Sequence, residues 1–188
     1  MEPNILDAQD STSTDVQRVG FGIRLGASLL DIVTIIAITF ALAPLLSGVS
    51  NEYISAIFSQ NPEFVHLDGW MGALMRAVLL IPIIDMVYHL VEGLTGLTLG
   101  KLIVGIKVGS KEGTQSEVGN LFLRYLLKSS GTILSLLNLY IGIQLLGSLG
   151  GLANFAIFVG CFFVLGDKRQ AFHDMLSKTA VYKRSMLK

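Results

Sequence analysis

Arg24 and Asp31 are the first residues of the chain whose types and spacing can do chemistry. They lie seven residues apart at the head of an otherwise uncharged apolar run that continues to Leu46. In a helix, seven residues make nearly two turns, so both side chains share one face, roughly 10 Å apart along the axis. A carboxylate within a membrane span costs at least about 2.5 kcal/mol, so Asp31 needs a partner, water or a proton.

Two interpretations of this pair follow. In the first, Asp31 binds a cation or a proton within the membrane, and Arg24 tunes the charge of the site. In the second, the pair fixes helix packing or insertion, and Arg24 extends to the cytoplasmic lipid phosphates. Arg24 carries no transported proton in either case, because a guanidinium stays protonated.

Asp85 and His89 form a second titratable pair, four residues apart on one face of a predicted membrane helix. Such a pair can act as a proton relay or a cation site. Alternatively, His89 lies at the level of the cytoplasmic headgroups and Asp85 bonds to a neighbouring helix. One carboxylate and one imidazole are too few ligands for a metal ion, so no metal site is predicted.

A glycine-rich stretch over residues 93–107 contains Lys101. Backbone N–H groups in such a stretch can cradle a phosphate, with Lys101 adding positive charge. The segment GLTLGK has the wrong spacing for a Walker A loop and lacks a Ser or Thr after the lysine. Packing of a surface hairpin against helix ends is the alternative use of these glycines.

His173 and Asp174 lie in a strongly basic closing segment. No serine or cysteine nucleophile is arranged with them, so we predict neither an enzyme nor a cofactor site. Asp174 is expected to act as a cap or to pair with a basic residue from another loop. The neighbouring lysines and arginines are expected to hold anionic lipid headgroups.

The composition indicates an integral membrane protein. Of 188 residues, 52% are hydrophobic and only 15% are charged, where a soluble domain carries about 25% charge. Residues 131–165 contain no charged side chain, a run longer than the roughly 20 residues that one span requires. The single cysteine, Cys161, excludes an intrachain disulfide and is interpreted as a small core residue.

The apolar segments predict an all-α membrane protein with about four transmembrane helices, because lipid requires internally paired backbone. Paired glycines mark the break between the last two helices, which we place in GSLGG at residues 147–151. The predicted spans are residues 25–46, 71–90, 121–146 and 149–166.

The connecting segments differ in character. Residues 1–17 form a polar, flexible tail, and residues 183–188 form a basic tail. A short amphipathic surface helix is predicted within residues 47–70, with Trp70 as an interface anchor. Alternating apolar residues in LIVGIKV, within residues 92–108, predict a short strand or a glycine-rich hairpin at the surface between spans two and three.

The distribution of Lys and Arg predicts the orientation. Residues 47–75 contain neither, whereas residues 101–128 and 167–188 contain many. The positive-inside rule therefore places both basic segments, the hairpin and both termini in the cytoplasm. The predicted partner is a bilayer with anionic headgroups on that side; no nucleic-acid partner is predicted.

Three segments together resemble the RDD family of bacterial membrane proteins. They are RLGASLLD at residues 24–31, EGLTGLTLGKLIVGIKV at residues 92–108 and FHDMLSKTAV at residues 172–181. The resemblance covers residues 18–182 as one transmembrane domain and implies a bacterial cytoplasmic (inner) membrane. Arg24, Asp31 and Asp174 match positions named in the family, whereas Asp85 and His89 match no motif of it.

The resemblance also implies a function, because some family members have been linked to sodium(potassium)/proton antiport. We therefore expect a small secondary transporter that exchanges a monovalent cation for protons through intramembrane carboxylates. Four helices are few for alternating access, so a homo-oligomer is expected. The alternative is a non-catalytic subunit or scaffold that docks onto a larger membrane complex, since the 20 glycines permit close helix approach.

Overall fold

The computed structural model describes residues 17–45 and 69–187, and this part of the chain is mostly helical. The long helices are α1 (Phe21–Leu42), α3 (Gly69–Thr95), α5 (Val118–Ile141) and α6 (Gln144–Cys161). The shorter elements are α4 (Leu99–Val104), β1 (Ile106–Ser110), η3 (Phe162–Leu165), α7 (Phe172–Leu176), β2 (Thr179–Lys183) and η4 (Arg184–Met186).

Three helical stretches of the described residues are long and apolar enough to cross a membrane. They are Phe21–Leu42, Trp70–Thr95 and Gln144–Leu165, with mean hydropathies of 2.2, 1.8 and 2.0. The chain is therefore a multi-pass helical membrane protein, as predicted. The helix α5 has 24 residues but carries Arg124 and Lys128 and is not among the three, so the count of four spans stays a prediction.

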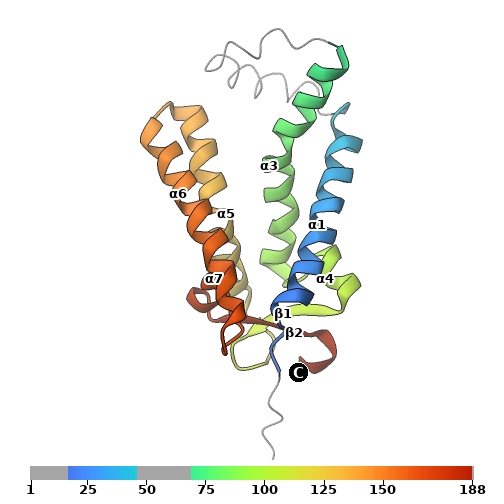
Figure 1. The fold of residues 1–188 in the computed structure, drawn as a ribbon, viewed down its shortest axis with the longest axis vertical. Helices are drawn as coiled ribbons and strands as arrows, with labels where there is room; N and C mark the ends of the chain where they lie inside the picture. Colours follow the sequence, from blue (N-terminus) through green and yellow to red (C-terminus); the bar gives the residue numbers. More distant parts are fainter. Residues whose placement is uncertain (1–16, 46–68, 188) are drawn as a thin grey trace, which may run out of the picture.

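Figure 1 shows the long helices as two pairs, α1 with α3 and α5 with α6, which rise from a layer of short elements. This layer contains α4, α7 and the two strands. The described chain ends meet there, because Arg18 forms an isolated bridge with Tyr182. Segments far apart in the sequence are thus held together at one end of the molecule.

The glycine-rich segment differs from the predicted hairpin. It forms the helix α4 and then the strand β1, whose partner is the distant strand β2. The strands pair antiparallel, with Ile106 opposite Lys183 and Ser110 opposite Thr179. The pairing buries Val108 and Val181 in a small core, and this burial favours the distant strand over a local hairpin partner.

The predicted break at residues 147–151 is wrong. The helix α5 ends at Gly142, whose φ of +74° suits a left-handed cap, and α6 runs through GSLGG without interruption. The glycines of α6 instead permit close packing on α5. A Cβ at Gly150 would lie 2.8 Å from the carbonyl oxygen of Gly131, and one at Gly147 would lie 2.9 Å from Nδ2 of Asn138.

We expect Gly131→Ala to lower the free energy of unfolding by about 1–3 kcal/mol, the usual range for overpacking. The added Cβ would lie 2.7 Å from the backbone carbonyl oxygen of Gly150, so α5 and α6 must separate. Thermal unfolding of the detergent-solubilised protein measures the loss. Gly151→Ala is the matched control, because no atom lies within 4 Å of its added Cβ; equal melting temperatures for the two variants would contradict the packing argument.

The remaining helix boundaries differ from the predicted ones by a few residues. The helix α1 begins at Phe21, four residues before the predicted start, and α3 extends to Thr95. Pro82 lies inside α3 without ending it, as neighbouring helices in a membrane allow. The predicted surface helix and most of its segment lie outside the described residues, whereas Trp70 belongs to α3 and is 75% exposed.

Candidate functional site

The carboxylate of Asp31 is buried on α1 and accepts three hydrogen bonds from neutral donors. The hydroxyl of Tyr88 and the backbone N–H of Gly100 donate to Oδ1 at 2.6 and 2.8 Å. The hydroxyl of Thr98 donates to Oδ2 at 2.7 Å. Asp31 thus joins α1 to α3 and to the start of α4, and its side chain is satisfied without a cation.

Gly100 permits this arrangement. A Cβ at residue 100 would lie 2.2 Å from the carbonyl oxygen of Ala27 and 2.7 Å from Oδ1 of Asp31. Thr98 also caps α4, because its side chain accepts from the N–H of Lys101. The segment GLTLGK therefore positions α4 against α1 through one glycine and one threonine.

Arg24 pairs with Asp174 rather than with Asp31. Its Nη1 donates to Oδ2 of Asp174 at 2.7 Å, and its Nη2 donates to the carbonyl oxygen of Arg169 at 2.7 Å. Arg124 donates through Nε to Oδ1 of the same carboxylate at 2.7 Å. Asp174 thus pairs with basic residues as expected, but these lie on the helices α1 and α5 rather than in a loop. The interpretation in which Arg24 and Asp31 form a pair is wrong, because Arg24 contacts Asp174.

Asp174 is fully buried and remains ionised. Burial alone would raise its pKa, but the positive charge of Arg124, and then that of Arg24, hold the pKa below the usual range of an aspartate. Asp174 also accepts from the N–H of Ala171 at the start of α7. One carboxylate therefore ties α1, α5 and α7 together.

Glu92 is the third buried acid, near the C-terminal end of α3. Its Oε1 contacts Nζ of Lys101 and Nη1 of Arg124, and its Oε2 accepts from Nζ of Lys128 at 3.0 Å. Glu92 and Asp174 share Arg124, so the two carboxylates and their cations form one network. We call this the ionic network: Arg24, Glu92, Lys101, Arg124, Lys128 and Asp174.

The sequence alone predicts no site role for Glu92, Arg124 or Lys128. The two cations contribute only to the predicted orientation of the chain. The signals that could have found them are the seven-residue spacing from Asp85 to Glu92 and the four-residue spacing from Arg124 to Lys128, which place each pair on one helix face. Their meeting depends on the packing of α3 on α5, which no local pattern encodes.

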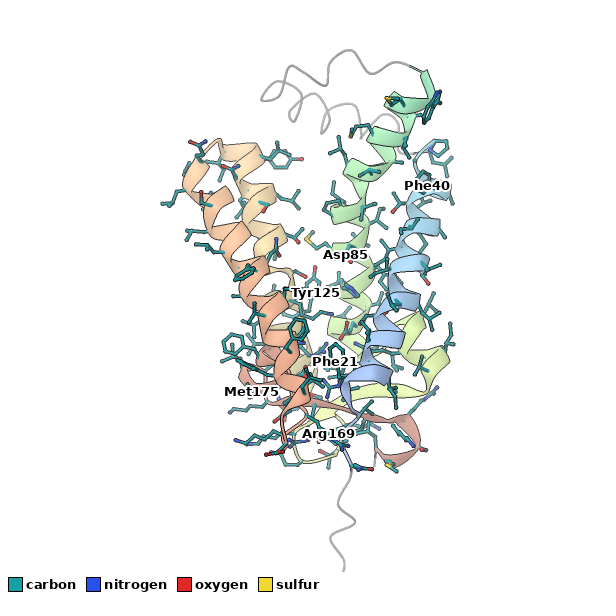
Figure 2. All side chains as sticks on the ribbon, in the orientation of Figure 1. Phe21, Phe40, Asp85, Tyr125, Arg169 and Met175 are labelled. Carbon is teal, nitrogen blue, oxygen red and sulfur yellow. The ribbon has the colours of Figure 1, made fainter. Side chains whose placement is uncertain are left out.

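Asp85, His89 and Glu92 form a row along one face of α3. His89 Nε2 lies 3.4 Å from Oδ1 of Asp85, and Nδ1 lies 3.6 Å from Oε2 of Glu92. The row passes from the Asp85 side chain, which is 41% exposed, to the Glu92 side chain, which is 4% exposed. Figure 2 shows Asp85 on α3 between the two helix pairs.

His173 lies beside the ionic network on α7. Its Nε2 is 3.3 Å from Nη2 of Arg124, and its Nδ1 has no hydrogen-bond partner among the described residues. Burial, and then the positive charge of Arg124, hold the pKa of His173 well below its usual range. The imidazole is therefore neutral at pH 7.

The glycine-rich stretch serves packing in this structure. A Cβ at Gly93 would lie 2.8 Å from Cβ of Tyr125, and Gly96 and Gly105 adopt φ values of +73° and +75°. Lys101, the proposed phosphate ligand, contacts Glu92 instead. Within residues 17–45 and 69–187, no group of three or more His, Cys, Asp or Glu side chains is placed to hold a metal ion.

The fold and the site together define a class: a multi-pass helical membrane protein whose helices are joined at one end by buried ion pairs between side chains. The sequence model of the RDD family matches residues 18–178, and the chain belongs to this family. The predicted family is thus confirmed. No curated protein and no solved structure matches the chain.

Proposed function

We propose that this RDD family protein is a small secondary transporter that exchanges a monovalent cation for protons. The row of Asp85, His89 and Glu92 is the observation that carries the proposal. An imidazole between two carboxylates can accept a proton at one ring nitrogen and release one at the other. The two nitrogen–oxygen separations, 3.4 and 3.6 Å, need only small side-chain movements to become hydrogen bonds.

Glu92 can couple the proton to a conformational change. As a carboxylate it holds three cations, which come from α4 and α5. A proton on Glu92 removes its negative charge and weakens its attraction to all three. Helix α3 would then separate more easily from α4 and α5, as alternation between two conformations requires.

We assign Asp85 as the carboxylate for which the cation and the proton compete. Its side chain is 41% exposed, whereas both oxygens of Asp31 are occupied by neutral donors. Asp31 is thus the anchor of α1 in this proposal. A homo-oligomer remains part of the proposal, because one chain contributes only a few spans.

The proposed topology has four spans, with both termini in the cytoplasm of a bacterial cell. The antiparallel packing of α5 on α6 supports α5 as the fourth span (Figure 1). The pairing of Arg18 with Tyr182 supports both chain ends on one side. In this topology the layer of short elements faces the cytoplasm, and the proposed function includes no enzymatic step.

Proton flux in proteoliposomes tests the proposal. A pulse of Na⁺ or K⁺ outside vesicles that hold a pH-sensitive dye should drive proton movement through the wild-type protein. Asp85→Asn and His89→Asn should each lower this flux at least about a hundredfold, the low end for loss of a positioned proton-transfer group. Glu112→Gln is the matched control, because Glu112 has a 60% exposed side chain far from the row.

Two outcomes would overturn the transporter. One is wild-type protein that moves no protons in response to either cation. The other is unchanged flux in folded Asp85→Asn protein.

The alternative function is a scaffold subunit, for which the many glycines were the argument. Three of them, Gly131, Gly147 and Gly150, are occupied by the contact between α5 and α6 of the same chain. These three are therefore not open for a partner helix, whereas Gly22, Gly26 and Gly151 face open space. Recovery of one stoichiometric partner in mild detergent, together with absent flux, would favour the scaffold instead.

A further inference from the structure

A cavity of about 420 Å³ lies beside the ionic network, between α1, α5 and α6. This volume is within the range of small-molecule sites. Four cationic side chains line it, and its lining contains no Asp or Glu. The four cations are Arg24, Lys101, Arg124 and Lys128.

The carboxylates that contact these cations do not line the cavity. Arg24 and Arg124 share Asp174, and Arg124, Lys101 and Lys128 share Glu92. Two carboxylates thus serve four cations. The ammonium group of Lys128 has three N–H donors, and it forms one hydrogen bond in the described structure. Because the side chain is also 25% exposed, the other donors are available to a ligand.

Apart from the four cations, the wall of the cavity is mostly apolar. It includes Leu25 and Ile32 on α1 and Phe158 on α6. These side chains are 45%, 51% and 62% exposed. Both helices are candidate membrane spans, so their exposed apolar faces meet acyl chains in a bilayer.

Two stacked aromatic rings lie at the end of this wall that is near the layer of short elements. The rings of Phe21 and Phe162 stack with centroids 6.0 Å apart, and Figure 2 shows Phe21 near the layer of short elements. A ligand that enters from the lipid between α1 and α6 would thus meet an apolar passage first and the cations at its end.

We propose that this cavity binds one anionic phospholipid. Its phosphate contacts Lys128 and the neighbouring guanidinium groups, and the start of an acyl chain lies along Leu25, Ile32 and Phe158. Arginine and lysine bind phosphate oxygens through charge-assisted hydrogen bonds. The site goes beyond the proposed function, because lipid binding does not depend on the row of Asp85, His89 and Glu92.

The apolar wall favours a lipid over free phosphate. A water-soluble phosphate would be served by the cations alone and would make no use of Ile32 and Phe158. A zwitterionic lipid has no net charge to offset the two positive charges that Asp174 and Glu92 leave unmatched. An anionic phospholipid can pair with the cations through its phosphate and contact the apolar residues with its acyl chain.

Cys161 provides the test, because it lines the cavity and is the only cysteine of the chain. The full chain is placed in nanodiscs of phosphatidylcholine alone or with added phosphatidylglycerol. A small membrane-permeant maleimide then labels Cys161, and mass spectrometry follows the rate. We expect phosphatidylglycerol to slow labelling several-fold, because the bound lipid covers the thiol.

Lys128→Gln should weaken the protection. Loss of one lysine near an anionic lipid corresponds to about fivefold in affinity, so about fivefold more phosphatidylglycerol should be needed. Lys183→Gln is the matched control, because Lys183 is exposed on β2 and does not line the cavity. Ser28→Phe, which fills the cavity from α1, should slow labelling in phosphatidylcholine and remove the effect of phosphatidylglycerol.

Three outcomes would overturn the lipid site. The first is equal labelling in both kinds of nanodisc. The second is protection that Lys128→Gln retains at every lipid fraction. The third is equal protection by soluble glycerol phosphate in phosphatidylcholine nanodiscs, which would assign the site to a free phosphate. None of these readouts measures proton flux, so the lipid site and the transporter fail separately.

Discussion

Asp174→Asn is expected to lower the free energy of unfolding by about 3–5 kcal/mol, the range for removing one partner of a buried ion pair. The asparagine keeps the size of the side chain but removes its charge. Arg24 and Arg124 then lose the carboxylate that each contacts at 2.7 Å. Because these arginines belong to α1 and α5, we expect the two helix pairs to separate at the layer of short elements.

Chemical denaturation in detergent micelles measures this loss, with Asp167→Asn as the matched control. Asp167 lies seven residues earlier, is exposed and has no ion pair among the described contacts. The control should change stability by less than about 0.5 kcal/mol, as surface substitutions do. A loss at Asp174 no larger than that of the control would show that the buried carboxylate does not hold the helices together.

The loss of stability caused by Asp174→Asn is expected to depend on pH. Asp174 has a lowered pKa in the folded protein, so its contribution is fully present above about pH 4, the value of an unfolded aspartate. It is lost as the pH falls from there toward the folded pKa. The difference in stability between wild type and Asp174→Asn should therefore narrow below about pH 4 and stay constant from pH 5 to 7.

Asp31→Ala is expected to lower the free energy of unfolding by about 3–5 kcal/mol, because each buried donor left unsatisfied costs about 1–3 kcal/mol. The donors are Tyr88, Thr98 and the N–H of Gly100. Asp31→Asn should cost less, about 1–2 kcal/mol, since its amide oxygen can still accept from Tyr88 and Gly100, and only the charge assistance and the hydrogen bond that Thr98 donates are lost.

This pair of variants separates an anchor from an ion ligand. If Asp31 is an anchor, folded Asp31→Asn protein keeps most of its cation-dependent proton flux, and Asp31→Ala loses flux together with stability. Tyr88→Phe is a graded control, because it removes one of the three donors and should cost about 1 kcal/mol. Flux abolished in stable Asp31→Asn protein would instead make Asp31 the ion ligand.

The membrane class and the family could be predicted from the sequence because they depend on local quantities. Apolar runs of about 20 residues force helices in lipid whatever their neighbours are. The three segments around Arg24, residues 92–108 and Asp174 sufficed to identify the RDD family. The need of Asp31 for a partner was also predictable, since a carboxylate in an apolar span must be neutralised or hydrated, whereas the pairing of Asp174 was expected from its basic surroundings.

The partners of these carboxylates could not be predicted. The seven-residue spacing on one helix face made Arg24 the obvious partner of Asp31, yet Arg24 contacts Asp174, which is 150 residues away. Helix periodicity says which side chains share a face but not which other segment faces them. The same ambiguity affected GSLGG, where glycines that suggested a turn permit close helix packing instead.

The residues alone thus determined that this is an RDD family membrane protein with acids that must be neutralised inside it. Only the tertiary structure decided how. Asp31 is satisfied by neutral donors, and Glu92 and Asp174 by four cations from α1, α4 and α5. The physical reason is that the cost of placing a charge in an apolar segment depends on its neighbours in the sequence. Neutralisation of that charge depends instead on contacts between helices that are distant in the chain.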